Sequence, residues 1–215
     1  MGTESIEASF LSIFALISFF VFLLVSKYSY KIKDGALLDK DFFKPQAFHD
    51  IPITRSGGIA AIISLSIFFV IYYLLYSQIL YDYIFISYSM FLVGFLDDLK
   101  INIKPSKRLI IMVLLLFLFI FILPIKIFNI DIPILIPLMS NHILSSVFVL
   151  LCFLFVINGA NLIDGFNGLL AINLIIINVI LACINMNNEN LEFAVLLISQ
   201  IIILLSFLLF NFPSA

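Results

Sequence analysis

Residues 91–100 read FLVGFLDDLK, and this stretch indicates the fold class of the whole chain. It begins as an apolar membrane segment and ends in two adjacent carboxylates, Asp97 and Asp98. A charged side chain at the centre of a membrane helix costs about 2.5–3.5 kcal/mol on insertion scales, so the pair needs a physical reason. Two reasons are open. The aspartates either mark a helix end at the water interface or belong to a functional site at the membrane.

The composition around this stretch is that of a membrane protein. The chain has 215 residues, of which 64% are hydrophobic and 11% are charged, and its mean hydropathy is +1.25. A soluble domain averages about 45–50% apolar and about 25% charged residues. We therefore expect a polytopic protein embedded in a bilayer, without a nucleic-acid partner. Cys152 and Cys183 form no C-x-x-C pair and support neither a metal site nor a disulfide.

Apolar runs separated by polar segments predict an all-α fold, a polytopic transmembrane helical bundle with about seven spanning helices. The predicted spans are residues 8–26, 57–76, 83–96, 109–123, 143–157, 169–184 and 191–210. Glutamates precede the first span and lysines follow it, which is the reverse of a secretory signal peptide and favours an uncleaved anchor. No internal repeat or low-complexity tract interrupts the pattern, so residues 1–215 are expected to form a single integral membrane domain.

The distribution of basic residues predicts the orientation. Six of the eleven Lys and Arg residues lie in 27–56 and four lie in 99–108. The positive-inside rule places both loops in the cytoplasm, with the N-terminus outside and the C-terminus inside. By alternation, residues 158–168 also face the cytoplasm. All the unusual polar motifs therefore fall on one membrane face, as a single site requires.

Asp97 and Asp98 can divide two tasks between them. Adjacent residues on a helix point about 100° apart, so the two carboxylates need not bind the same atom. One can ligate Mg²⁺ while the other acts as a base or orients the substrate. Mg²⁺ usually takes one or two carboxylates and completes its octahedron with water and substrate phosphate.

A second motif, NxxNxxDGxNG at residues 158–168, is more specific. It places three carboxamides and one carboxylate within eleven residues, directly after an apolar span. Asn158, Asn161 and Asp164 recur every three positions, so they share one helical face. The glycines that follow permit a break in the helix. The alternative is a polar turn between two helices at the interface.

The first cytoplasmic loop ends in HDIPITRSGG, residues 49–58, where Arg55 precedes the two glycines that open the second span. The N–H groups at a helix N-terminus favour phosphate, and arginine adds a fixed positive fork. The alternative is that Arg55 only fixes the topology and the glycines only serve helix packing. Lys104, Lys107 and Arg108 either face anionic headgroups or a lipid phosphate, or serve the topology alone.

Taken in order, HxxPxxRxGG at 49–58, GFxDD at 94–98 and NxxNxxDGxNGL at 158–169 resemble the motifs of the polyprenyl-phosphate N-acetylhexosamine-1-phosphate transferases. This family, glycosyl transferase family 4, includes the undecaprenyl-phosphate GlcNAc-1-phosphate transferases and the phospho-MurNAc-pentapeptide transferase. The similarity runs from about residue 34 to the end of the chain.

The resemblance implies a reaction at the cytoplasmic face of the plasma (inner) membrane. The phosphate of a polyprenyl carrier such as undecaprenyl phosphate attacks the sugar-linked phosphorus of a UDP-N-acetyl sugar, and UMP leaves. Positioning, charge neutralisation and Mg²⁺ on the diphosphate supply most of the catalysis in such a step. The product begins a cell-envelope polysaccharide of the O-antigen or cell-wall type. The resemblance also allows a homodimer.

By motif matching, Asp97 is the family's catalytic aspartate and Asp98 is its metal- or substrate-linked partner. Asn158, Asn161 and Asp164 then line the nucleotide and metal site. The implied metal ligands are Asp97, Asp98 and Asp164, and the implied substrate-binding residues are Arg55, Asn158, Asn161, Asp164 and Asn167.

The chain departs from the family pattern in two places. Asn167 stands where many relatives carry a second aspartate, which affects the sugar more than the reaction. Residues 211–215 resemble the beginning of a further cytoplasmic motif whose His-rich continuation is absent, so we expect the N-terminal part of a longer transferase, inactive by itself. The competing class is a catalytically incomplete or non-enzymatic relative that acts as a membrane scaffold or transporter. A transporter favours mid-span polar residues and repeated halves, whereas the polar motifs here lie at span ends.

Overall fold

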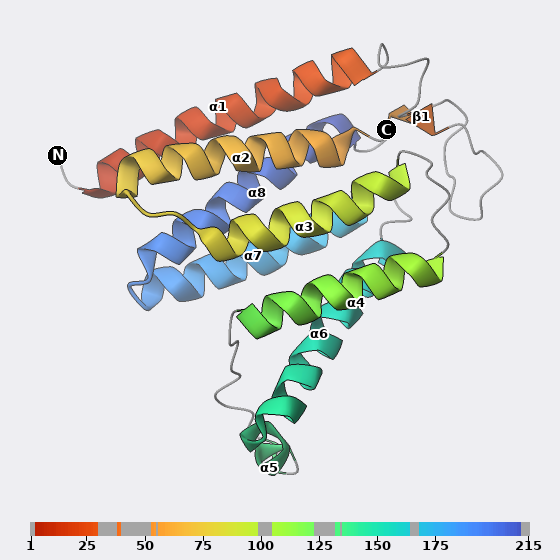
Figure 1. The fold of residues 1–215 in the computed structure, drawn as a ribbon. Coiled ribbons are helices and arrows are strands. Elements are labelled where there is room, and N and C mark those ends of the chain that lie inside the picture. The colour runs from red at the N-terminus through yellow and green to blue at the C-terminus, as the bar shows by residue number, and fades with distance from the viewer. Residues whose placement is uncertain are drawn as a thin grey trace. The chain divides into compact units, whose positions relative to one another are not determined.

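The computed structural model describes residues 3–29, 38–39, 53–54, 56–98, 105–122, 132–133, 135–163 and 168–211. Almost all of these residues are helical (Figure 1), as expected where a bilayer leaves no water to satisfy backbone N–H and C=O groups. The helices are α1 (Thr3–Ser29), α2 (Gly57–Tyr76), α3 (Tyr81–Asp98), α4 (Pro105–Ile122), α5 (Ile136–Ser140), α6 (His142–Ile163), α7 (Leu169–Asn187) and α8 (Leu191–Asn211). The predicted all-α class is confirmed.

One short departure from the helical pattern lies in the first polar loop. β1 (Leu38–Asp39) and β2 (Ile53–Thr54) pair antiparallel, with Leu38 opposite Thr54. The sequence did not predict this pair, because two residues per strand are too few to show the alternation of a strand. β2 ends directly before the start of α2.

Within the described residues, five helical segments are long and apolar enough to cross a membrane. They are Ser9–Ser29, Gly57–Tyr76, His142–Ala160, Leu169–Asn187 and Leu191–Asn211. α3 is apolar over a shorter length, Tyr81–Leu96. The chain is therefore a multi-pass membrane protein. The count of seven spans and the orientation of the two termini stay predictions.

The helices group into two compact units. The first unit contains α1, α2, α7 and α8, and the second contains α3, α4, α5 and α6. The first unit thus joins the beginning of the chain to its end and depends on contacts between residues far apart in sequence. The single integral membrane domain expected for residues 1–215 stays a prediction.

In the first unit, α1 and α2 pack antiparallel through aromatic and small side chains. The ring centroids of Phe14 and Phe68 lie 5.5 Å apart, and Phe10 stacks on Phe68 at 6.0 Å. Further along, the hydroxyl of Ser18 donates to that of Ser64 over 3.5 Å, and both serines are fully buried. Small side chains let membrane helices approach closely, and the hydroxyl pair satisfies polar groups that the bilayer cannot.

The contacts of α8 fix the direction of its neighbours in the first unit. Phe210, near the end of α8, stacks on Phe22 in the second half of α1 at 6.4 Å, so α1 and α8 run parallel. Glu192, at the start of α8, accepts a hydrogen bond of 3.4 Å from Gln78 just beyond α2, so α2 and α8 run antiparallel. α7 turns back into α8 through a tight turn in which Glu189 has a φ of 58°.

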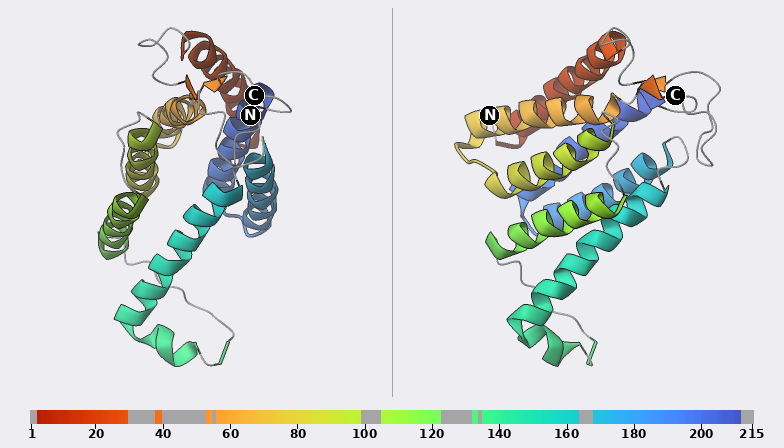
Figure 2. Two further views of the ribbon diagram at one scale, coloured as in Figure 1. Left: turned by 90° about the vertical axis from the view of Figure 1, so that its right-hand side faces the viewer. Right: turned by 45° about the vertical axis from the view of Figure 1, so that its right-hand side comes forward.

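These directions bring four helix ends to one end of the first unit (Figures 1 and 2). α1 and α8 finish there, and α2 and α7 begin there. Two of the predicted motifs therefore lie at the same end of the first unit. They are the paired glycines at the start of α2 and Gly168 before α7. The single cytoplasmic face that the sequence predicted for the polar motifs stays a prediction.

In the second unit, α3 and α4 pack antiparallel around a small apolar core. Phe85 of α3 stacks on Phe119 of α4 with ring centroids 6.2 Å apart and ring planes 10° apart. Phe119 also meets Phe153 of α6 edge-on at 6.2 Å. Ile120 and Val149 are buried beside these rings. The core thus joins all three long helices of the unit.

Asn141 fixes where α6 begins. Its Oδ1 accepts hydrogen bonds from the backbone N–H groups of Ile143 and Leu144, at 3.0 and 3.4 Å, as a helix N-cap does. From there α6 runs to the end of the second unit at which α3 finishes and α4 begins (Figures 1 and 2). The helix ends that carry the GFxDD and NxxNxxDGxNG motifs therefore lie at one end of this unit.

Cysteine labelling tests the predicted orientation. In a background without Cys152 and Cys183, which are exposed, single cysteines at Lys40 and Asn187 are expected to label from opposite sides of the membrane. Lys40 lies in the basic loop before α2 and Asn187 at the turn after α7, so the positive-inside rule separates them. An impermeant maleimide added to intact cells should reach position 187 and not position 40. Equal labelling of both from outside would contradict the single face.

Candidate functional site

Two carboxylates are the last two residues of α3. The helix continues to Asp98, two residues beyond the predicted end of the span, so both aspartates lie on the helix. The C-terminal end of a helix carries partial negative charge, and the last turn of α3 contains no basic residue. Asp97 and Asp98 add like charge to this end, an arrangement that a bound cation stabilises. Their side chains are outside the described part of the structure, so their roles stay predictions.

The turn of α3 before the aspartates has one open side. Gly94 is exposed, and a Cβ atom there would meet no described atom within 4 Å. Residues three and four apart share a helix face, so Gly94 adds no side chain to the face on which positions 97 and 98 lie. On the same helix, Phe91 and Phe95 stack with centroids 5.4 Å apart. Gly94 itself therefore presents no side chain that would block a close approach to this turn of α3.

The end of α6 carries the first two asparagines of the second motif. α6 continues to Ile163, whereas the predicted span ends at residue 157, so Asn158 and Asn161 lie on the helix about one turn apart. Asn158 is half-buried, and its Nδ2 donates to the backbone carbonyl of Leu154 at 2.8 Å. The acceptor atom of this carboxamide, Oδ1, takes no part in that bond. The side chain of Asn161 is not described.

The break that the glycines were expected to allow is visible at Gly168. This residue has a φ of 76°, in the left-handed region that glycine adopts without strain. It is buried, and its carbonyl accepts the N–H of Ile172 at 2.9 Å, which begins α7. Asp164 and Asn167 lie outside the described residues, so substrate and metal binding by them stay predictions.

The paired glycines at the start of α2 have different surroundings. A Cβ atom at Gly58 would meet no described atom within 4 Å, whereas one at Gly57 would lie 2.7 Å from the ring of Phe207. Gly57 is the first residue of α2, as the sequence predicted. Arg55 is outside the described residues, so phosphate binding by this side chain stays a prediction.

A comparison with models of known protein families identifies the family of this chain. A family model described as glycosyl transferase family 4 matches residues 80–215, more than half of the chain. The chain belongs to glycosyl transferase family 4. The resemblance drawn from the three motifs is thereby confirmed, and the protein is a membrane phosphosugar transferase in general terms. No curated protein and no solved structure matches it.

The family 4 match covers the GFxDD and NxxNxxDGxNG motifs. Asp97, Asp98 and residues 158–168 fall inside the matched range, and Arg55 lies before it. Among the residues whose side chains are described, no three His, Cys, Asp or Glu lie close enough together to hold a metal ion. The predicted metal ligands are not among those side chains.

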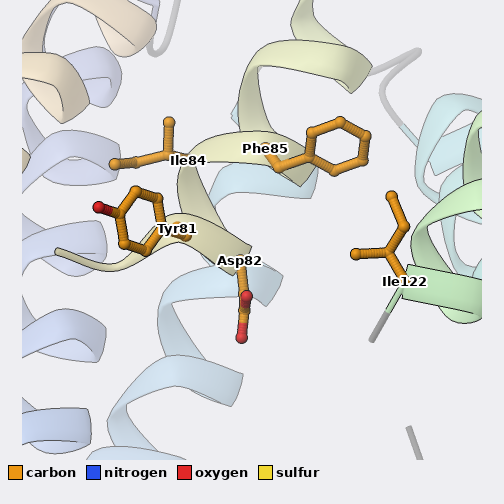
Figure 3. A pocket seen from close by; sticks show the side chains of 5 residues that line it. All are labelled: Tyr81, Asp82, Ile84, Phe85 and Ile122. Atoms are coloured by element: carbon orange, nitrogen blue, oxygen red, sulfur yellow. The ribbon is translucent and has the colours of Figure 1, made fainter. Parts of the chain in front are cut away.

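A cavity in the second unit lies far from these family 4 motifs. Its volume is about 370 Å³, and it is lined by Tyr81, Asp82, Ile84, Phe85 and Ile122 (Figure 3). These residues are at the start of α3 and the end of α4. At a rise of 1.5 Å per residue, the start of α3 is about 25 Å from Asp98. The cavity therefore does not belong to the candidate site.

One polar pair in the family 4 protein was not predicted from the sequence. Asn178 lies near the middle of α7 and Gln200 near the middle of α8, and Nδ2 of Asn178 donates to Oε1 of Gln200 at 3.3 Å. The only signal was the presence of amide side chains inside two apolar runs, Asn173 and Asn178 in one and Gln200 in the other. Because the two amides bond to each other, they act as a link between membrane helices. They do not favour the transporter alternative.

Proposed function

We propose that this family 4 member transfers an N-acetylhexosamine-1-phosphate from a UDP-sugar to a polyprenyl phosphate such as undecaprenyl phosphate. An oxygen of the carrier phosphate forms a bond to the sugar-linked phosphorus, the phosphoanhydride bond breaks, and UMP leaves. The product is a polyprenyl-diphosphate sugar at the cytoplasmic face of the plasma (inner) membrane. It would begin the synthesis of a cell-envelope polysaccharide.

The observation that supports this proposal most is the shared end of α3 and α6 in the second unit, inside the matched range (Figure 2). One helix contributes consecutive carboxylates there, and the other contributes carboxamides. A charged or amide group near hydrocarbon is energetically unfavourable unless water solvates it or it binds a partner or ligand. A polar turn would explain the second motif alone, but not a second set of polar groups brought to the same end by another helix.

The surface of α6 next to Asn158 suits a lipid substrate. Leu151, Phe155 and Val156 lie within two turns of it and are 47%, 78% and 68% exposed. Exposed apolar side chains on a membrane-spanning helix face hydrocarbon. A polyprenyl chain can therefore lie along this face while its phosphate stays at the polar end of the helix.

The donor chemistry at the end of α3 fits Mg²⁺. Asp97 and Asp98, joined by Asp164 of the second motif, offer the hard oxygen ligands that this ion prefers. The negative helix end and the absence of a basic residue from the last turn of α3 also favour a cation there. When bound, Mg²⁺ neutralises charge on the diphosphate. We assign the binding of this ion to these three carboxylates.

The remaining tasks fall to other atoms of the chain. The carboxylate of Asp97 accepts a proton from the carrier phosphate or holds that phosphate for attack. Asn158 and Asn161 bind the nucleotide sugar through their carboxamides, which donate and accept hydrogen bonds. Arg55 offers a fixed positive fork to a substrate phosphate.

The direct test is UMP release by the purified full-length protein that contains residues 1–215. It is incubated in detergent with undecaprenyl phosphate, Mg²⁺ and each of a panel of UDP-N-acetyl sugars, and the lipid fraction is analysed by mass spectrometry. We expect one sugar to give both UMP and the lipid-diphosphate sugar, and no UMP when the lipid phosphate is omitted. Binding of a UDP-sugar without UMP release from any member of the panel would contradict the proposal and favour a catalytically incomplete relative.

Asn167→Asp is expected to change sugar use more than Mg²⁺ use. The substitution adds a negative charge beside the proposed diphosphate site, so KM for the UDP-sugar should rise about three- to tenfold, or the preferred sugar should change. The measurements are KM for two UDP-sugars and the Mg²⁺ concentration that gives half-maximal rate. Asn188→Asp, at the exposed end of α7 away from the motif, is the matched control. Loss of the Mg²⁺ response in Asn167→Asp alone would contradict this placement.

A further inference from the structure

The sequence around α5 is too apolar for an ordinary connection between two helices. Residues 132–163 contain no Lys, Arg, Asp or Glu, and Asp131 and Asp164 stand directly on either side. This uncharged run has 32 residues, whereas about 20 are enough to cross the hydrocarbon. The candidate span on α6, His142–Ala160, uses 19 of them. Residues 132–141 therefore do not belong to the span, and they carry no charge that would hold them in water.

The chain turns at Asn141, between α5 and α6. α5 ends at Ser140, and Asn141 caps α6 through hydrogen bonds from the N–H groups of Ile143 and Leu144. Figure 2 shows α5 running across the start of α6 rather than in line with it. Because membrane-spanning helices tilt on average by about 20° from the bilayer normal, a helix that crosses the start of α6 lies nearer to the membrane plane.

Apolar side chains are exposed on both sides of this turn. Ile132 and Ile136 are 50% and 58% exposed, and Ile143 at the start of α6 is 73% exposed. The residues between them are polar and exposed, namely Ser140, Asn141 and His142. Exposed aliphatic side chains next to polar ones, at the end of a spanning helix, are typical of the boundary between acyl chains and headgroups.

Several polar groups of the segment bond within the segment itself. The N–H of Leu135 donates to the carbonyl of Ile132, and the N–H of Met139 donates to the carbonyl of Leu135, both at 2.9 Å. The hydroxyl of Ser140 donates to the carbonyl of Pro137 at 2.7 Å. Local satisfaction of this kind is what a backbone beside hydrocarbon requires.

We infer that α5 and Ile132 form a membrane-surface anchor. They lie at the boundary between headgroups and acyl chains, on the side of the bilayer opposite to the motif-bearing end of α6, and Ile132 and Ile136 contact acyl chains. The partner is lipid, because the exposed isoleucines adjoin the level at which α6 enters the bilayer. Its binding depends on apolar area and not on headgroup charge, since residues 132–163 contain no Lys or Arg. This placement does not depend on the transferase reaction.

Tryptophan fluorescence measures the depth of the anchor, because residues 1–215 contain no Trp. Ile136→Trp and, separately, Ile132→Trp are introduced into the full-length protein and reconstituted in vesicles of phosphatidylcholine brominated either near the glycerol or near the end of the acyl chains. The emission of the unsubstituted protein is subtracted. We expect both positions to be quenched at least about twofold more by the shallow bromines than by the deep ones, and weakly by iodide in the water. Partial replacement of the lipid by phosphatidylglycerol should not change this order.

Two reference variants calibrate the depth. Leu151→Trp lies on the exposed side of α6, about 14 Å beyond His142 by helix rise, so the deep bromines should quench it most. Asn188→Trp lies in the exposed polar turn between α7 and α8, so iodide should quench it most. All variants are compared at equal amounts of inserted protein.

Three outcomes would overturn the anchor. Quenching at positions 132 and 136 mainly by iodide would place α5 in water, and quenching mainly by the deep bromines would place it inside the hydrocarbon. Quenching by neither agent would show that protein covers α5. A strong dependence on phosphatidylglycerol would contradict binding through apolar area. Because the two positions are substituted separately, a folding defect in one variant leaves the other to decide.

Discussion

Asp97→Asn is expected to lower UMP release by about a hundredfold or more, with an unchanged amount of protein in the membrane. The substitution keeps the size of the side chain and removes its charge. A positioned acid or base typically contributes about 10²–10⁴-fold to a rate, and loss of a cation ligand adds to that effect. The neutral residue at the end of α3 should not weaken the helix, because a carboxylate opposes the helix dipole there. The measurement is UMP release at saturating substrates, beside quantification of the inserted protein.

Asp82→Asn is the matched control for this prediction. Asp82 lies in the first turn of the same helix, is exposed, and is about 22 Å from Asp97 by helix rise. Its neutralisation removes one carboxylate from α3 without touching the candidate site, so activity should stay within about twofold. Wild-type turnover in Asp97→Asn would show that this residue only ends the helix at the interface. An equal loss in both variants would point to the charge of α3 as a whole.

Removal of divalent cations is expected to reduce UMP release to background, and added Mg²⁺ should restore it. A UDP-sugar diphosphate and a lipid phosphate would bring several negative charges toward the site proposed for Asp97, Asp98 and Asp164. At 4 Å, two like charges repel by about 4 kcal/mol at an effective dielectric constant of 20. Without a cation, this repulsion opposes binding of both substrates. The measurement is initial rate against free Mg²⁺ after treatment with a chelator.

Two further measurements test whether the effect of cation removal is on activity and whether it is specific for Mg²⁺. The unfolding temperature should change little on chelation, because the bundle is held by helix packing. Ca²⁺ should restore less activity than Mg²⁺, since Mg²⁺ demands a smaller, near-octahedral site. Full turnover in excess chelator would contradict the metal assignment, and the carboxylates of α3 would then need another role.

Hydropathy predicted the bounds of the helices best where polar residues end an apolar run abruptly. The predicted span 57–76 coincides with α2, and 191–210 differs from α8 by one residue, because glycine, serine or asparagine closes each run. For α6, the predicted end at residue 157 falls six residues short of Ile163. Polar residues mark the edge of the hydrocarbon, but a helix can continue past that edge, and Asn158 does so with a bond to the preceding turn.

The contacts between helices could not be predicted in the same way. The pairing of Asn178 with Gln200 and the packing of Gly57 on Phe207 depend on which helix faces meet, which a single apolar pattern does not specify. The residues of the candidate site were predicted from the motifs, because their side chains are of the types that bind metal ions and phosphates. In the structure, the motif-bearing ends of α3 and α6 lie at the same end of one unit. The roles of Arg55, Asp164 and the other proposed ligands remain predictions to be tested by substitution.

The parallel packing of α1 on α8 also has a consequence for biosynthesis. Phe22 finds its partners Phe207 and Phe210 only after roughly 180 further residues have been made. At about 5–20 residues per second, α1 waits roughly 10–40 s in the membrane for α8. During that interval Phe22 of α1 lacks these two aromatic partners. Nascent chains arrested before α8 should therefore be more sensitive to protease than the released protein.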